Sequence, residues 1–114
     1  MCYKLIKWGA TWKAARDFCL NKEGDLVSIK DRQTNEFIVS LGPPWGKFII
    51  GGHDDEIEGE WKWPDGSHMA YSNWNTGEPN NKNGDEDYLL FLGSGGKWAD
   101  VGESRTAWFF CQKA

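Results

Sequence analysis

The sequence has no long apolar run, which argues against a membrane-spanning chain. Its 114 residues are 39% hydrophobic, and no stretch approaches the roughly 20 apolar residues that a helix needs to cross a bilayer. An excess of basic residues is also missing, because the formal net charge is -4, whereas nucleic-acid binding depends on a basic patch. A chain of this length forms one hydrophobic core. We therefore expect a single domain over residues 1–114, with no membrane span and no nucleic-acid partner.

Recognisable catalytic motifs are missing as well. The sequence contains no nucleophile elbow, phosphate-binding loop or cofactor fingerprint. Its two histidines, His53 and His68, form neither an HExxH pattern nor a zinc set with the cysteines. We expect both histidines to be structural or exposed. An EF-hand is excluded, because no glycine stands at the sixth position of a loop that ends in glutamate at the twelfth. The protein is therefore not expected to be an enzyme.

Cysteine is scarce. The three residues Cys2, Cys19 and Cys111 are too few for a disulfide-dense scaffold, and they leave one residue over. A bridge between Cys19 and Cys111 would close a loop of roughly 90 residues, which the chain-entropy model values at about 4–5 kcal/mol. The alternative for this pair is two buried free thiols. Cys2 stands near the terminus without an obvious partner.

Hydrophobic periodicity predicts helices in the first half of the chain. Thr11 is a candidate N-cap for a helix whose apolar face carries Trp12, Ala15 and Cys19. Asp31 is the candidate N-cap of a second helix, which ends at a glycine followed by two prolines. Residues 24–29 between the two helices form a short strand or an extended link.

The second half of the chain changes to the period of strands. Expected strands lie at residues 47–52, 60–63, 88–92 and 106–112, with a shorter one around Trp98. Residues 64–87 have little regular pattern, and a loop of that length is usually functional or disordered. Its Tyr71 and Trp74 indicate packing rather than disorder. Two helices, short antiparallel strands and a long ordered loop together predict an α+β fold.

Eight tryptophans allow two interpretations, a sugar-stacking surface or a hydrophobic core. The spacing favours the core for six of them. These are Trp12, Trp61, Trp63, Trp74, Trp98 and Trp108.

Negative charge is concentrated in two windows. Residues 54–60 hold five carboxylates and residues 78–87 hold four, with Lys82 the only basic residue in either window. Closely spaced like charges repel one another unless a cation compensates them. The two windows are therefore either solvated acidic loops or parts of a cation site.

Several motifs, taken in order, resemble those of the C-type lectin domain. They are WKAARDFCLNKEGDLVSIKDRQTNEFI, GHDDEIEGEWKWPDGS, YSNWNTGEPNN, GDED, KWAD and the final Cys111. The most specific elements are Glu78-Pro79-Asn80, the later Glu86, and Trp98-x-Asp100. The resemblance covers essentially the whole chain. It implies a C-type lectin-like fold, with two helices packed on short antiparallel sheets and a long calcium-binding loop. It also implies a Cys19–Cys111 disulfide and a secreted or extracellular protein.

The resemblance also implies one or two bound Ca²⁺ ions. Calcium takes about six to eight oxygen ligands from carboxylates and amide carbonyls. By resemblance, the sugar-binding ion is held by Glu78, Asn80, Glu86 and Asp100. An auxiliary ion that stabilises the loop is held by Asp54, Glu58, Asn81 and Asp87.

The ligand that the resemblance implies is a sugar of the mannose type. The Glu-Pro-Asn order goes with mannose, fucose, glucose and N-acetylglucosamine, whose 3- and 4-hydroxyls coordinate the calcium. Glu78 can accept a hydrogen bond from a sugar hydroxyl and Asn80 can donate one, while Glu86 completes the sugar-binding set. The family also has a cis peptide bond at the position of Glu78–Pro79. The expected partners are carbohydrates or the glycans of glycoproteins, and a weak single site favours an oligomer that gains avidity.

The departure from the family pattern that bears most on sugar binding is at position 99. Trp-Asn-Asp is usual where this chain has Trp98-Ala99-Asp100. Alanine neither ligates calcium nor donates to the sugar, and such a loss costs about 1.5–3 kcal/mol. We expect weakened sugar binding at this site. The alternative is a C-type lectin-like domain that has lost sugar binding and recognises a protein or another non-sugar ligand.

Overall fold

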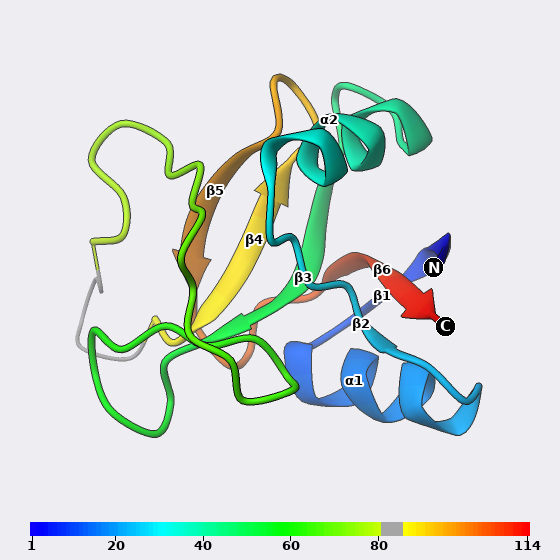
Figure 1. The fold of residues 1–114 in the computed structure, drawn as a ribbon, viewed down its shortest axis with the longest axis horizontal. Helices are drawn as coiled ribbons and strands as arrows, with labels where there is room; N and C mark the ends of the chain where they lie inside the picture. The colour runs from blue at the N-terminus through cyan, green and yellow to red at the C-terminus, as the bar shows by residue number, and fades with distance from the viewer. Residues whose placement is uncertain (81–85) are drawn as a thin grey trace.

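The computed structural model describes residues 1–80 and 86–114 and has two helices beside one sheet (Figure 1). The helices are α1 (Trp12–Asn21) and α2 (Arg32–Leu41). The strands are β1 (Cys2–Ala10), β2 (Asp25–Leu26), β3 (Lys47–His53), β4 (Tyr88–Leu92), β5 (Lys97–Val101) and β6 (Ala107–Lys113). This arrangement confirms the expected α+β fold. Neither helix is long and apolar enough to cross a membrane, and no other helix is found in the described residues.

The sheet is mixed rather than purely antiparallel. Its strand order is β1-β6-β3-β4-β5, and the short β2 also pairs with β6. All pairs are antiparallel except β3 with β6, in which Phe48 lies opposite Trp108. Residues 60–63 were expected to form a strand, and that expectation is wrong. Only Lys62 forms bridges there, one with His53 at the end of β3 and one with His68, so the segment is paired at a single position rather than along a strand.

Strand β1 was not predicted from the sequence. It pairs with β6 at the edge of the sheet. Only Ile6 and Ala10 of this strand are buried, and the register shifts between these two residues. An exposed edge strand with an irregular register leaves little alternation of apolar and polar residues, so the sequence gives only a weak signal.

The two predicted helix starts are confirmed. The Thr11 hydroxyl accepts a hydrogen bond from the Ala14 N–H at 3.3 Å, and the Asp31 carboxylate accepts one from the Thr34 N–H at 2.7 Å. Each side chain satisfies a backbone donor that has no partner within the first turn of its helix.

The sheet separates two hydrophobic clusters, because neighbouring residues of a strand point to opposite faces. Phe109 of β6 belongs to the cluster that includes Trp12 of α1. The next residue, Phe110, belongs to the cluster that includes Ile38 of α2. Helices α1 and α2 thus cover opposite faces of the sheet.

The tryptophans expected in the core are there. Trp12, Trp63 and Trp98 are buried, and three more are partly buried against the α2 cluster, namely Trp61, Trp74 and Trp108. The two remaining tryptophans are exposed, Trp8 by 46% and Trp45 by 76%.

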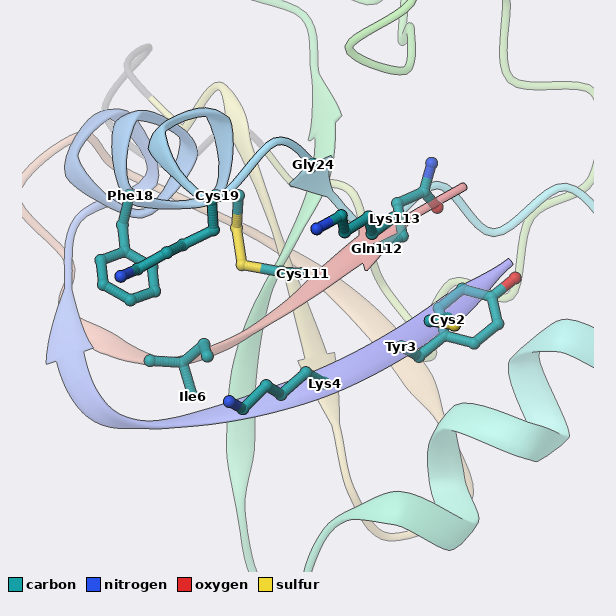
Figure 2. A pocket seen from close by; sticks show the side chains of 11 residues that line it. Cys2, Tyr3, Lys4, Ile6, Phe18, Cys19, Gly24, Cys111, Gln112 and Lys113 are labelled. Carbon is teal, nitrogen blue, oxygen red and sulfur yellow. A yellow bond between two sulfur atoms is a disulfide. The ribbon is translucent and has the colours of Figure 1, made fainter.

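A disulfide joins Cys19 of α1 to Cys111 of β6, which settles the question that the sequence left open. Figure 2 shows this bond beside a hollow of about 390 Å³ between α1 and β1. No carboxylate is among the described residues that line the hollow, whereas Lys4, Lys22 and Lys113 are, so its charge does not favour a metal ion. Cys2 is free and exposed.

Removal of this disulfide is expected to lower the free energy of unfolding by about 4–5 kcal/mol, because the bridge constrains a long loop in the unfolded chain. The cysteines are 92 positions apart. The test is urea unfolding of a variant with Cys19→Ala and Cys111→Ala, with Cys2→Ser as the control that leaves the bridge intact. A loss below about 1 kcal/mol would contradict the assigned role of the bridge.

Candidate functional site

Three aspartates of the acidic windows and of β5 meet at one end of the sheet. Asp54 follows the last residue of β3, Asp87 precedes the first residue of β4, and Asp100 is the penultimate residue of β5. The antiparallel registers of β3 with β4 and of β4 with β5 bring these positions to the same end. Asp54 and Asp100 are buried. Negative charge is therefore held inside the protein at this end.

The first acidic cluster consists of Asp54, Glu58 and Asp87. One carboxylate oxygen from each residue lies within 4.8 Å of the others. The Asp54 N–H donates to the Asp87 carbonyl at 2.9 Å, and the Gly59 N–H donates to Asp54 Oδ2 at 2.9 Å. Gly59 has a φ of 84°, which favours glycine, so the chain can turn back over Asp54 at this point.

The electrostatics of this cluster suit a cation. Asp54 is 2% exposed, and burial, together with the carboxyls of Glu58 and Asp87, raises the pKa of Asp54 to about 7. Burial also raises the pKa of Asp87. Oδ1 of Asp54 and Oδ1 of Asp87 are buried and accept no hydrogen bond from the described residues. Buried carboxylate oxygens without donors are costly, and a hard divalent cation fits such a set of oxygens.

The segment that leads to Glu78 is fixed along β5. Trp74 forms a parallel bridge with Trp98. The Trp98 N–H donates to the Asn73 carbonyl at 2.9 Å, and the Asn75 N–H donates to the Trp98 carbonyl at 2.8 Å. The Glu78 N–H then donates to the Asn75 carbonyl at 2.9 Å. The start of the Glu-Pro-Asn motif is thus placed by backbone hydrogen bonds that lead to β5.

Helix α2 holds β5 in turn through Asn35. This side chain is 3% exposed, accepts from Trp98 Nε1 at 2.9 Å and donates to the Gly96 carbonyl at 3.0 Å. The same carbonyl accepts from Asn73 Nδ2 at 2.7 Å. One buried amide therefore connects α2, β5 and the long loop.

The second set brings together Glu78, Asn80 and Asp100. The Asn80 N–H donates to Asp100 Oδ1 at 3.1 Å, and Asn80 Nδ2 donates to Glu78 Oε2 at 3.2 Å. The Glu78–Pro79 peptide bond is cis, as the resemblance implied. These contacts join residues 22 positions apart in the sequence into one group at the end of β5.

Glu78 has the same electrostatic character as Asp54. Burial, then Asp100 and the charge of Glu86, raise the pKa of Glu78 to about 7. Glu86, the fourth predicted residue, directly precedes Asp87 in the sequence, and its charge is the smallest contribution to this rise in the pKa of Glu78. Oε1 of Glu78 is buried and accepts no hydrogen bond within the described part of the chain. The oxygen atoms of this set therefore also suit a hard divalent cation, which prefers oxygen ligands.

The remaining predicted positions are Asn81 and the residue before Asp100. Asn81, expected in the auxiliary set, lies outside the described residues. Ala99 is half-buried on β5 opposite Leu90, and its methyl group supplies no ligand atom beside Asp100. The second set therefore has no side-chain donor or ligand from the position before Asp100.

His53 is structural, in agreement with the sequence analysis. Its Nδ1 lies 2.7 Å from Asp55 Oδ1, and the Tyr88 hydroxyl donates to Asp55 Oδ2 at 3.5 Å. Trp12 contacts both rings, with centroids 5.1 Å from His53 and 4.9 Å from Tyr88. His53 and Tyr88 adjoin Asp54 and Asp87 in the sequence, so Trp12 of α1 supports both acidic positions from below the sheet end.

Sequence analysis missed the anchoring roles of Asn35, Asn73 and Asn75. The hydrogen bonds of Asn75 and one of Asn73 come from the backbone, which gives no residue-type signal. Gly59 did carry a signal, because a glycine inside an acidic window indicates a turn with positive φ.

Comparison with known proteins identifies the family of this chain. Residues 9–113 match the lectin C-type domain, and the chain belongs to this family. It is 40% identical over 103 residues to the mouse low affinity immunoglobulin epsilon Fc receptor, covering 88% of this chain and 30% of that receptor. The chain thus spans less than a third of the length of this relative. The family is a lectin family and this relative is a receptor, and neither is an enzyme.

Solved structures agree with this assignment. The carbohydrate-recognition domain of the mouse scavenger receptor C-type lectin superposes with a TM-score of 0.93 at 30% identity, covering 99% of this chain and 91% of that one. The carbohydrate-recognition domain of cow CD23, determined in the presence of a GlcNAc2Man3 oligosaccharide, superposes with a TM-score of 0.90 at 36% identity. That alignment covers 99% of this chain and 88% of the CD23 domain.

The raised carboxyl pKa values predict an unusual pH dependence for the calcium-free protein. A carboxyl whose pKa is raised on folding stabilises the fold at low pH, and this contribution is lost as the pH rises through the folded-state pKa. For Asp54 and Glu78 the window runs from about 4 to about 7. In EDTA, the free energy of unfolding should therefore decrease across this window, and calcium should restore it most strongly near pH 7.

Urea unfolding at several pH values measures this dependence. Asp54→Asn should flatten the decrease seen in EDTA, whereas Asp17→Asn, a change at an exposed position of α1, should leave it as in the parent protein. A free energy of unfolding that stays constant or rises between pH 4.5 and 7 in EDTA would refute the assigned electrostatics.

Proposed function

We propose that residues 1–114 form one extracellular or secreted lectin domain that binds calcium and, through calcium, carbohydrate of the mannose type. The observation that carries this proposal is the second acidic set. In it, Asn80 is hydrogen-bonded to both Glu78 and Asp100, and a buried oxygen of Glu78 lacks a donor among the described residues. The oligosaccharide present with the CD23 domain supports a glycan as the ligand class.

The residues of this set have distinct proposed roles. Glu78, Asn80, Glu86 and Asp100 hold the ion, and Asp100 adds its backbone carbonyl. Bound calcium supplies open coordination positions for two neighbouring sugar hydroxyls. Glu78 uses its spare lone pairs to accept from one hydroxyl, and the amide of Asn80 donates to the other. The hydrogen bond between Asn80 Nδ2 and Glu78 Oε2 shows that this donor and this acceptor already face each other.

The first acidic cluster is proposed as an auxiliary calcium site. Asp54, Glu58 and Asp87 would hold this ion together with Asn81. Because Asp54 follows β3 and Asp87 precedes β4, a cation here would tie the loop to the sheet. Its role would be to order the loop, while the sugar contacts remain with Glu78, Asn80 and Glu86. The domain would then bind one or two ions.

The proposed sugar class rests on the Glu-Pro-Asn order. It favours mannose, fucose, glucose and N-acetylglucosamine, which present a suitable pair of 3- and 4-hydroxyls. Natural ligands would be glycans of glycoproteins. A single open site binds weakly, so we propose that several copies act together to gain avidity.

A second candidate function has its own support. Ala99 removes one ligand and one donor from the proposed sugar site, and the chain is 40% identical to a receptor named for immunoglobulin. A domain that binds a protein in place of sugar would agree with both observations. The two functions differ in whether a monosaccharide competes for the site.

Retention on immobilised mannose tests the main proposal. The protein should bind the column in calcium and elute with EDTA or with free methyl mannoside. Glu78→Gln should reduce retention by at least about tenfold, because a neutral amide is a weaker ligand for calcium and a weaker acceptor.

Glu103→Gln is the matched control, because Glu103 is exposed and lies outside both acidic sets. It should be retained like the parent protein. Failure of the folded parent protein to bind in calcium would count against the sugar function and leave the protein-binding alternative.

The missing asparagine leads to a gain-of-function prediction. Ala99→Asn should restore a ligand and a donor, and should raise sugar affinity by about ten- to a hundredfold, in line with about 1.5–3 kcal/mol for a charge-assisted hydrogen bond. Competition by methyl mannoside measures the change, with Ala99→Ser as a shorter polar control. Unchanged affinity in Ala99→Asn would show that Ala99 is not what weakens the site.

A further inference from the structure

Trp45 is more exposed than any other large hydrophobic residue that the structure describes, at 76%. It lies between α2 and β3 and makes no contribution to either core cluster. Its ring is held against Trp108 of β6 in an edge-on arrangement, with centroids 6.1 Å apart and planes at 65°. A large aromatic surface that is both exposed and supported often marks a binding site.

Trp45 forms one wall of a cleft of about 320 Å³. Trp108, Lys47, Arg105 and Thr106 also line it, and no described lining residue is a carboxylate. Neither Lys47 nor Arg105 forms an ion pair with any described residue. Two cations that pair with no carboxylate of the described residues thus flank an exposed indole, on a chain whose net charge is -4.

The cleft adjoins a second hollow that leads toward the proposed sugar site. This hollow, of about 490 Å³, shares Arg105 and Thr106 with the cleft and reaches Glu86. The segment between β5 and β6 forms its wall. A glycan held at the second acidic set could therefore extend over Arg105 toward Trp45.

We propose that the Trp45 cleft is a second, calcium-independent subsite that binds an anionic sugar residue. The C–H groups on one face of a pyranose ring carry partial positive charge and fit against the electron-rich face of the indole. A carboxylate or sulfate on the same ring would pair with Arg105, whose guanidinium can bind it through two hydrogen bonds, and with Lys47. The choice of a sugar rests on the proposed function, whereas the preference for a negative charge follows from the lining of the cleft.

The test is made in EDTA, so that the calcium sites cannot contribute. Digalacturonic acid and a heparin-derived sulfated disaccharide are titrated into the whole chain, with cellobiose as the uncharged probe. Binding is followed by the NMR signals of the tryptophan indole N–H groups. We expect saturable shifts centred on the Trp45 signal for at least one acidic disaccharide, a weaker response to cellobiose, and an affinity that falls with added salt.

Substitutions of the lining residues test whether the disaccharide binds in the Trp45 cleft. Trp45→Ala should weaken binding by about tenfold or more, and so should Arg105→Gln combined with Lys47→Gln, which should also reduce the salt dependence. Trp8→Ala is the matched control, because Trp8 is exposed but does not line the cleft. Glu78→Gln should leave binding in EDTA unchanged, so failure of the calcium site and failure of this cleft are separable.

Two results would overturn the proposal. One is the absence of saturable binding by both acidic disaccharides to protein whose NMR spectrum shows it to be folded. The other is equal weakening by Trp45→Ala and Trp8→Ala. If an acidic peptide shifts the Trp45 signal and neither disaccharide does, the first of these results is met, and the cleft binds a protein rather than a sugar.

Discussion

Buried negative charge at one end of the sheet is the constraint on which the rest of the structure depends. Three strands deliver aspartates to that end, and two of these aspartates are buried. Oxygens of Asp54, Glu78 and Asp87 are buried without donors among the described residues. Such an arrangement is unfavourable for an isolated protein, because like charges repel and desolvated carboxylates resist ionisation. A divalent cation in place of the missing donors would make the arrangement favourable, which is the physical basis of the proposed calcium sites.

The remainder of the fold holds this charge in position. Asn35 fixes Trp98, and Trp98 in turn orders the loop through Asn73 and Asn75 before the loop reaches Glu78. The sheet divides the core into an α1 side and an α2 side, and both helices are capped by the side chains that precede them. The disulfide between α1 and β6 limits the entropy of the unfolded chain. The described part of the long loop is thereby placed so that Glu78 and Asn80 lie beside Asp100.

Much of this architecture could be predicted from the sequence, and the failures have physical reasons. The caps at Thr11 and Asp31 and the apolar strand 88–92 follow from local patterns that agree with the tertiary structure. Strand β1 was missed because an edge strand needs little burial. Residues 60–63 were wrongly predicted as a strand because their apolar residues, Trp61 and Trp63, pack into the α2 cluster while only Lys62 forms bridges. The acidic sets were predicted from motif resemblance, but their backbone anchors were not, since hydrogen bonds between main-chain atoms are independent of residue type. The exposure of Trp45 is likewise a tertiary property, which spacing alone does not reveal.

The central claim is that calcium and sugar bind to the same group of residues, and their thermodynamic coupling tests it most directly. The measurement is calorimetric titration of calcium into chelator-treated protein, alone and with saturating methyl mannoside. The account predicts a calcium dissociation constant in the range of about 0.1–1 mM, typical of extracellular modules. It also predicts tighter calcium binding in the presence of the sugar, because linkage is reciprocal. A calcium affinity that the sugar leaves unchanged, or the absence of any calcium heat, would contradict it.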